Sequence, residues 1–252
     1  MTDFSYQLYC SRNFPPLSRT LKMVAAAGYR NVEGYGALYA DPAKVAELKE
    51  HLAANGLRMP TGHFGLDMLE NDPGRVLEIA KAVGIETIYC PHIAADQRPD
   101  SGAGWLDFGR RLQEAGAPYR DAGLGFGWHN HDFEVRRTAD GALPLTAIFE
   151  GGPDLEWEAD IAWLIRGGAD PMEWIHALGK RITAVHVKDI APAGENADED
   201  GWADVGHGTV DWQALMTTLK ERSNARYYVM EHDNPKDDRR FAERSLAAAK
   251  KL

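Results

Sequence analysis

Residues 57–93 read LRMPTGHFGLDMLENDPGRVLEIAKAVGIETIYCPHI, in which two short apolar runs flank one amphipathic stretch. LRMPTGHF (57–64) and ETIYCPHI (86–93) are typical of strands, whereas DPGRVLEIAKAVG (72–84) has helical spacing. Asp72 followed by proline is a typical helix start, and Gly84 is a typical helix end. A strand, a helix and a second strand in this order predict two parallel strands joined by a helical crossover.

The same unit recurs along the chain. The other predicted strands are FSYQLYC (4–10), YRNVEGYG (29–36), GFGWHNHDF (125–133), LEWEAD (155–160), ITAVHVKD (182–189) and RYYVMEHD (226–233). Further helical patterns are LSRTLKMVAAAG (17–28), DPAKVAELKEHLAANG (41–56) and DWQALMTTLKERS (211–223), with Asp41 and Asp211 as N-caps. Strand–helix units repeated without a linker predict a single α/β domain over residues 1–252, a closed (β/α)₈ TIM barrel; an open doubly wound sheet is the alternative. The acidic stretch 191–208 is predicted to be an active-site loop after the seventh strand.

Composition narrows the class of protein. Among 252 residues, 44% are hydrophobic and 26% charged, which is ordinary for a globular protein. The net charge of −10 argues against nucleic acid as a partner, because such binding depends on clustered Lys and Arg. Two distant cysteines, Cys10 and Cys90, form no disulfide framework and fit a reducing cytoplasm. The chain shows no signal-peptide pattern and no apolar run long enough for a membrane span.

Most of the predicted strands end in ionisable residues. In barrel enzymes the C-terminal ends of the strands surround the substrate, so these side chains are expected to meet at one rim. They are Glu33, His63, His92, His129 with His131, Glu158 with Asp160, His186 with Lys188, and Glu231. A hydrogen-bonded rim residue is the alternative for Glu33, His63 and His92, and an ion pair with Asp189 or Glu158 is the alternative for Lys188.

The stretch GWHNHDFEV (127–135) is the densest part of this set. On a strand His129 and His131 point to the same face, which is costly in an apolar core but suits a metal site or a cleft. A divalent cation is the simplest reason to gather so many carboxylates and imidazoles, because the carboxylates would otherwise repel one another. We expect one such ion, with Mn²⁺ placed first and Mg²⁺, Co²⁺ or Zn²⁺ as alternatives that the ligand types do not separate.

Five motifs, in order along the chain, resemble the sugar phosphate isomerase/epimerase family of xylose-isomerase-like TIM barrels. They are WHNHDFE (128–134), EADIAWLIRGGADP (158–171), ITAVHVKD (182–189), VGHGTVDW (205–212) and YVMEHD (228–233). The resemblance implies one divalent metal held by His129, Asp160, His186 and Glu231. It further implies that Lys188 and His131 face the substrate, with Glu33 and His63 as inward polar residues. His129 stands where similar ketose epimerases have Glu, so the branch that the chain resembles includes inosose dehydratase and enzymes acting on 3-keto-glycosides.

The resemblance implies an enzyme of carbohydrate metabolism that removes a proton α to the carbonyl of a keto or aldo sugar. A metal favours that step by withdrawing electron density as the enediolate forms. Epimerisation or isomerisation is expected, and elimination by a lyase or dehydratase is the alternative. The predicted catalytic residues are Glu231, His129, His131 and Lys188. The predicted substrate-binding residues are Glu33, His63, His92, Glu158, Trp163 and Trp202, the two tryptophans because aromatic faces stack on sugar rings.

Two other readings have weaker support. Apurinic-site endonucleases share this barrel but need three zinc ions, and Trp163 replaces one of their expected histidines. A noncatalytic sugar-binding subunit is disfavoured because all four ligand positions carry suitable residues. The expected partner is a small-molecule sugar or keto-glycoside; a homo-oligomer or a hetero-oligomer is compatible with the sequence.

Overall fold

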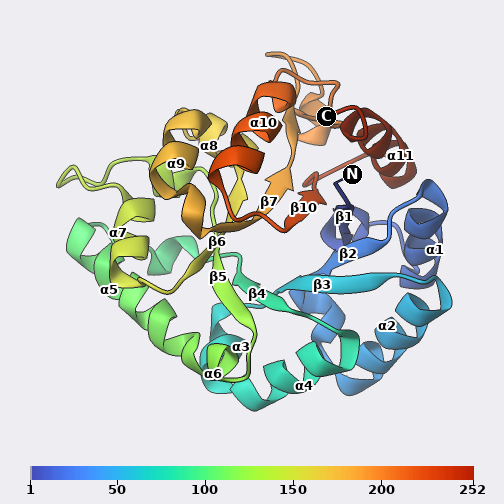
Figure 1. Ribbon diagram of the computed structural model, residues 1–252, viewed down its shortest axis with the longest axis horizontal. Helices are drawn as coiled ribbons and strands as arrows, with labels where there is room; N and C mark the ends of the chain where they lie inside the picture. The colour runs from blue at the N-terminus through green and yellow to red at the C-terminus, as the bar shows by residue number, and fades with distance from the viewer. Residues whose placement is uncertain (1) are drawn as a thin grey trace.

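In the computed structural model, which describes residues 2–252, eight parallel strands close into a barrel (Figure 1). The barrel strands are β1 (Phe4–Gln7), β2 (Asn31–Gly34), β3 (Arg58–His63), β4 (Thr87–Cys90), β5 (Gly125–His129), β6 (Glu156–Asp160), β7 (Ile182–Val187) and β10 (Tyr227–Met230). Their order is β1-β10-β7-β6-β5-β4-β3-β2, and β2 returns to pair with β1. This closed order confirms the predicted barrel and excludes the open sheet.

Helices surround the barrel as an outer ring, as Figure 1 shows. They are α1 (Leu17–Ala27), α2 (Pro42–Ala54), α3 (Leu66–Asn71), α4 (Pro73–Val83), α5 (Gly102–Ala115), α6 (Ala117–Asp121), α7 (Pro144–Gly151), α8 (Ile161–Arg166), α9 (Pro171–Leu178), α10 (Trp212–Arg222) and α11 (Asp238–Ala249). Asp41, Asp72 and Asp211 each accept a hydrogen bond from the backbone N–H three residues later, which confirms the predicted N-caps. Gly28 and Gly84 end α1 and α4 with φ of 104° and 84°, a conformation that favours glycine.

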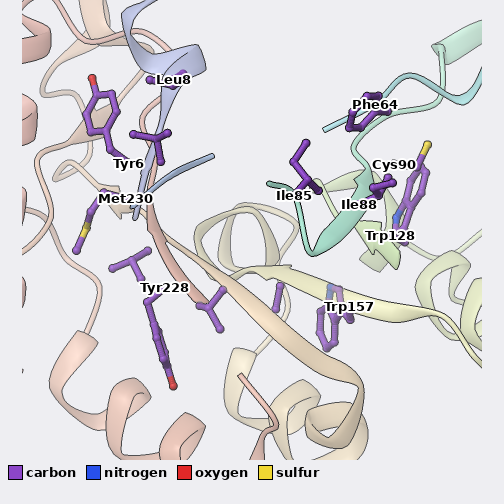
Figure 2. Close-up of a cluster of buried hydrophobic side chains, with 14 of the residues drawn as sticks. Tyr6, Leu8, Phe64, Ile85, Ile88, Cys90, Trp128, Trp157, Tyr228 and Met230 are labelled. Atoms are coloured by element: carbon purple, nitrogen blue, oxygen red, sulfur yellow. The ribbon is translucent and has the colours of Figure 1, made fainter. Parts of the chain in front are cut away.

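The two faces of the strands differ in chemistry. Outward-facing aromatic side chains pack against the helices: Trp128 contacts Phe108 of α5, and Trp157 contacts Phe149 of α7. Figure 2 shows Trp128 and Trp157 among the apolar side chains between sheet and helices. Parallel strands covered by helices are expected to carry such apolar faces. The inward-facing set instead contains buried polar residues, among them Gln7, Glu33 and Glu158, and this interior provides the site.

Several strands are shorter than the sequence predicts. β1 ends at Gln7, because Leu8–Ser11 form a 3₁₀ turn in which Gln7 Oε1 accepts the N–H of Tyr9. β5 ends at His129 and β10 at Met230. His131 and Glu231 therefore lie just beyond the strands, on backbone that already turns toward the loops.

The stretch predicted as one irregular loop, 191–208, contains local structure. The strands β8 (Asp189–Ile190) and β9 (Trp202–Ala203) pair as a two-stranded antiparallel ribbon. Between them, Ala197–Glu199 form a 3₁₀ turn. Other 3₁₀ turns are Gly36–Tyr39, Ala95–Gln97, Phe133–Val135 and Gly179–Arg181. Among residues 2–252, no helix combines the length and the apolar character needed to cross a membrane.

Candidate active site

The rim residues surround one pocket of about 480 Å³ at the C-terminal end of the barrel. Seven of the residues singled out from the sequence line it, namely His63, His92, His129, His131, Trp163, His186 and Glu231. Five others lie behind this lining: Glu33, Glu158, Asp160, Lys188 and Trp202, all nearly or fully buried. The pocket is also lined by residues that sequence reasoning missed, including Gln7, Tyr9, Tyr35 and Asp233.

Three carboxylate and imidazole groups from β6, β7 and the end of β10 form what we call the aspartate cluster: Asp160, His186 and Glu231. His186 Nδ1 lies 3.7 Å from Asp160 Oδ2 and 3.9 Å from Glu231 Oε2. One ligand atom from each residue lies within 4.8 Å of the other two. None of these three atoms, all buried, makes a hydrogen bond to any residue that the structure describes.

A second group shares His186 and lies beside the first. It contains His63, His129, Glu158 and His186, and we call it the imidazole cluster. His129 Nδ1 lies 3.1 Å from Glu158 Oε2. His129 is thus grouped with Glu158 rather than with Asp160 and Glu231. The four residues predicted as ligands of one metal are therefore divided between two clusters that meet at His186.

The aspartate cluster fits a divalent cation. A metal ligand must present a lone pair, and the partner of the other ring nitrogen of a histidine decides which nitrogen is free. His186 Nε2 lies 2.8 Å from Glu33 Oε1, which also accepts a hydrogen bond of 2.7 Å from Gln7 Nε2. Burial lowers the pKa of His186, but Glu158, Asp160 and Glu33 outweigh burial and hold it well above its usual range in the metal-free protein. With Nε2–H donated to Glu33, a cation that displaces the Nδ1 proton would meet a lone pair directed toward Asp160 and Glu231. Glu33, predicted to bind substrate, does not line the pocket and lies behind His186.

The charge of the aspartate cluster is set by Lys188, which is completely buried. Its Nζ donates a hydrogen bond to Asp233 and lies 2.6 Å from Glu231 Oε2 and 3.8 Å from Asp160 Oδ2. Burial lowers the pKa of Lys188, but Asp233 and the other two carboxylates outweigh burial and raise it. Lys188 is therefore a permanent cation, and its ion-pair partners are not the Asp189 and Glu158 considered from the sequence.

The two carboxylates of the aspartate cluster titrate far apart. Burial raises the pKa of Asp160, but Lys188 and His186 outweigh burial and bring that pKa to about 2. Burial and the neighbouring Asp233 raise the pKa of Glu231 to about 7. Asp160 is thus a fixed anion, whereas Glu231 exchanges its proton near neutral pH.

Neutral imidazoles occupy the strand-five side of the pocket. Burial and the charge of His186 lower the pKa of His129 to about 4. Burial and His129 hold the pKa of His131 well below its usual range. The ring of His131 lies 5.1 Å from that of His129 and 5.5 Å from that of Trp163, between centroids. Both histidines can therefore act as lone-pair donors at neutral pH.

A model of the family described as xylose isomerase-like TIM barrel matches residues 21–252. The chain belongs to the xylose isomerase-like TIM barrel family. A search of curated proteins finds no match.

Solved structures of low sequence identity share this xylose isomerase-like fold. A sugar phosphate isomerase/epimerase from Parabacteroides distasonis has a TM-score of 0.81 at 18% identity, covering 98% of this chain and 94% of its own. A 3-keto-D-glucoside 4-epimerase from E. coli has a TM-score of 0.73 at 18% identity over 100% of both chains. The IolI protein with a bound zinc atom has a TM-score of 0.72 at 16% identity, covering 99% of this chain and 96% of its own.

In this xylose isomerase-like barrel, the GWHNHDFEV stretch owes part of its pattern to structural hydrogen bonds. Asn130 Oδ1 accepts a hydrogen bond from Trp157 Nε1 at 2.9 Å and another from the N–H of Asp160 at 3.0 Å. These two bonds connect the end of β5 to β6. Glu134 accepts from Trp128 Nε1 at 3.1 Å and from the N–H of His131 at 2.9 Å. Burial raises the pKa of Glu134 to about 8. The two residues hold the histidines in place and do not line the pocket.

Asp189 organises the loop that follows β7. Its carboxylate accepts backbone N–H groups of Gly206, Gly208 and Val210 at 2.8–3.2 Å. A Cβ on Gly208 would lie 2.2 Å from Asp189 Oδ1, so only glycine allows this approach. The VGHG sequence is therefore a carboxylate-bound turn, and no residue of the predicted active-site loop 191–208 lines the pocket.

The two tryptophans predicted to contact sugar have different positions. Trp163 lines the pocket, and its ring packs edge-on against Trp202 with centroids 4.8 Å apart. Trp202 is buried. Lys188 Nζ lies 4.0 Å from the centroid of the Trp202 ring, and Arg166 Cζ lies 3.1 Å from it. Trp163 is thus placed to meet a ligand, whereas Trp202 covers the buried lysine.

Gln7 and Asp233 had a weak signal in the sequence. Gln7 is a polar residue at an inward position of a strand whose alternate residues are apolar. Asp233 follows Glu231 by two residues in MEHD. Their roles depend on contacts with Glu33 and Lys188 across the barrel, which no local pattern reveals.

Proposed function

We propose that this protein is a metal-dependent enzyme that removes a proton α to the carbonyl of a keto or aldo sugar and returns it to give an epimer or isomer. The observation that carries the proposal is the convergence of three buried ligand atoms, Asp160 Oδ2, His186 Nδ1 and Glu231 Oε2, beside the pocket, of which only Glu231 Oε2 has a close cation, Lys188 Nζ at 2.6 Å. Buried polar atoms normally make hydrogen bonds, so Asp160 Oδ2 and His186 Nδ1, which make none to a described residue, favour a cation bound between them and Glu231.

Asp160, His186 and Glu231 would hold the cation, which when bound polarises a substrate carbonyl and makes the adjacent C–H more acidic. Two carboxylates and one imidazole suit Mn²⁺, Mg²⁺, Co²⁺ or Zn²⁺, and Mn²⁺ is the first to test. His129 contributes to this proposal as a neighbour of the cluster rather than as a ligand within it.

Glu231 is the proposed base. A general base works best when its pKa is close to the working pH, because it is then deprotonated and still binds the proton well. In the metal-free protein the pKa of Glu231 is about 7, and in the metal-bound protein Glu231 is a carboxylate whose side chain lines the pocket, so it is placed to accept a proton from the substrate. Lys188 keeps the carboxylate ionised from the buried side; it does not line the pocket and acts by positioning and neutralising Glu231.

His131 is the proposed second proton carrier. It lines the pocket, and its Nδ1 is buried without a hydrogen-bond partner among the described residues. A neutral imidazole can accept a proton or donate one from its other nitrogen. Glu231 at the end of β10 and His131 after β5 thus supply two groups from different strands of the barrel, as reprotonation on another face requires.

The pocket favours a small unphosphorylated sugar. Tyr9, Tyr35 and Trp163 supply aromatic surfaces for a sugar ring, and no Lys or Arg among residues 2–252 lines the pocket. A phosphate group would be expected to meet such cations. The name of one similar structure, a 3-keto-D-glucoside 4-epimerase, agrees with an unphosphorylated keto sugar as the substrate class, whereas that of another, a sugar phosphate isomerase/epimerase, names phosphorylated sugars.

Elimination is the second candidate reaction. The unpartnered imidazole of His131 favours it, because the same group that reprotonates carbon can protonate a departing oxygen. Loss of a β-substituent would then give a dehydrated or deglycosylated product from the same first step.

The test is solvent proton exchange. The Mn²⁺-loaded protein in D₂O is incubated with free keto sugars, their phosphates and 3-keto-glycosides, and deuterium at the α carbon is followed by NMR. Exchange abolished by Glu231→Gln supports the proposal, and the product distinguishes epimer, isomer and elimination. Absence of exchange and conversion across the panel with a metal-loaded protein would contradict it and leave a noncatalytic binding barrel.

A further inference from the structure

Three imidazole nitrogens converge on a single carboxylate oxygen in the imidazole cluster. Glu158 Oε2 lies 2.5 Å from His63 Nε2, 3.1 Å from His129 Nδ1 and 3.4 Å from His186 Nε2. All four side chains are nearly or fully buried. They come from β3, β5, β6 and β7, so the barrel itself, rather than a loop, holds the arrangement.

Only some of the buried polar atoms in the imidazole cluster make hydrogen bonds. His186 Nε2 is directed to Glu33 Oε1 at 2.8 Å, and His63 Nε2 to Glu158 Oε2. His129 Nδ1 makes no hydrogen bond to a described residue in spite of its short distance to Glu158. Glu158 Oε1 and Glu33 Oε2 are also buried without a partner among residues 2–252. Such atoms cost about 1–3 kcal/mol each when nothing satisfies them.

In the imidazole cluster the only positive charge beside the carboxylates is on histidine: burial lowers the pKa of His63 and of His186, but the carboxylates, Glu158 first, outweigh burial and raise both. Glu33 and Glu158 are both completely buried, and no Lys or Arg within the described chain forms an ion pair with either. The aspartate cluster, in contrast, has Lys188. Two buried carboxylates need compensating charge, because isolated ionised groups are strongly disfavoured in a low-dielectric interior.

We propose that His63 Nε2, His129 Nδ1 and Glu158 Oε2 form a second divalent-cation site, separate from that of Asp160, His186 and Glu231. Two imidazoles and one carboxylate are a donor set for Zn²⁺, Fe²⁺ or Co²⁺ rather than for Mg²⁺. His186 keeps its hydrogen bond to Glu33 through Nε2 and serves the aspartate cluster through Nδ1. His63 and His129 line the pocket, which gives the cation a route in and leaves coordination positions facing the pocket.

This inference does not depend on the sugar chemistry, and its test measures metal content alone. The wild-type protein is stripped with a chelator, titrated with Co²⁺ in the presence of a competing chromophoric chelator, and analysed by mass spectrometry of bound metal after gel filtration. We expect two Co²⁺ per chain in two binding steps.

Variants assign the two steps. Glu158→Gln and His63→Asn are each expected to lose the Co²⁺ of the imidazole cluster and to keep that of the aspartate cluster. Asp160→Asn is expected to lose the Co²⁺ of the aspartate cluster and to keep that of the imidazole cluster. Glu156→Gln is the matched control, because Glu156 lies two residues earlier on β6 and contacts Thr183 rather than either cluster. It is expected to keep both ions. The visible spectrum of bound Co²⁺ should differ between the Glu158→Gln and Asp160→Asn proteins, since the remaining ligands differ.

The proposal is overturned if wild type binds at most one Co²⁺ and only Asp160→Asn removes it. It is also overturned if Glu158→Gln and His63→Asn bind as much Co²⁺ as wild type. If the wild type binds a single Co²⁺, and this ion is lost in Glu158→Gln but kept in Asp160→Asn, the result supports the site proposed here. The same result contradicts the cation site of Asp160, His186 and Glu231 assigned under the proposed function. The two-step titration of the unaltered protein keeps the test valid if one variant fails to fold.

Discussion

The ring nitrogen Nε2 of His186 lies 2.8 Å from Oε1 of Glu33, a residue 153 positions earlier in the chain. A carboxylate behind a histidine ligand fixes the ring and the tautomer and makes the free nitrogen a better donor. Metal affinity at the aspartate cluster should therefore depend on Glu33, although Glu33 does not line the pocket.

Glu33→Gln is expected to weaken cation binding about 10–100-fold, the usual effect of losing such a supporting carboxylate. The measurement is the dissociation constant for Mn²⁺ by calorimetric titration. Glu156→Gln should leave it unchanged. An unchanged constant in Glu33→Gln would show that His186 needs no help from Glu33.

Asp160→Asn is expected to remove the cation of the aspartate cluster without unfolding the protein. Asp160 Oδ1 also accepts the N–H of Trp163 at the start of α8, and asparagine can make the same cap. The rate of proton exchange into the substrate should fall by more than ~10–100-fold, the loss expected for a supporting residue such as Glu33. Circular dichroism checks the fold; activity equal to wild type would rule out Asp160 as a ligand.

Cation affinity at the aspartate cluster should increase as the pH rises through about 7, the pKa of Glu231. Below this pH Glu231 is protonated and must lose its proton before it binds, whereas Asp160, with a pKa of about 2, is already ionised. His186, whose pKa is raised by the neighbouring carboxylates, must also lose its Nδ1 proton, which strengthens the same increase of affinity with pH. Mn²⁺ binding measured from pH 5.5 to 8.5 tests this range. Glu231→Gln should bind more weakly and lack the step near pH 7, and a flat wild-type profile would contradict the role of Glu231.

Lys188→Met is expected to destabilise the metal-free protein by about 3–5 kcal/mol, because it leaves buried carboxylates without their cation. Since Lys188 lowers the pKa of Glu231, its loss should also move the pH dependence of metal binding upward. Denaturant unfolding gives the free energy. The double variant Lys188→Met/Glu231→Gln should recover part of the loss, and an additive further loss would contradict the ion pair.

Trp163 and Trp202 should respond differently to replacement by alanine. Trp163→Ala is expected to raise KM about tenfold with little change in kcat, which corresponds to ~1.4 kcal/mol of lost ring contact. Trp202→Ala should mainly reduce stability, by about 3–5 kcal/mol, because its buried ring fills space over Lys188. Steady-state kinetics gives KM and kcat, and thermal unfolding gives the stability of each variant. Equal changes of KM and of stability in the two variants would contradict the different roles assigned to Trp163 and Trp202.

The barrel was predictable because its signals are local. Each apolar run is short, each helical stretch has its own N-cap or terminal glycine, and alternation of the two leaves few possible architectures. The meeting of Asp160, His186 and Glu231 was predictable for the same reason, since the ends of parallel strands share one rim.

The depth and orientation of individual side chains were not predictable. Whether Glu158 faces substrate or three imidazoles depends on the stagger between β5, β6 and β7, including the register shift near Trp157. Which nitrogen of His186 is free depends on Glu33, on the opposite side of the barrel interior. Such distances arise only when the sheet closes, and no neighbouring residue in the sequence encodes them.

The carboxylate of Asp189 fixes the segment between β9 and α10 in the folded chain, because it holds the backbone at Gly206, Gly208 and Val210. The conformational entropy of this segment is therefore lost during folding and not when a ligand binds. Since none of these residues lines the pocket, a sugar should bind without any change in the order of this segment.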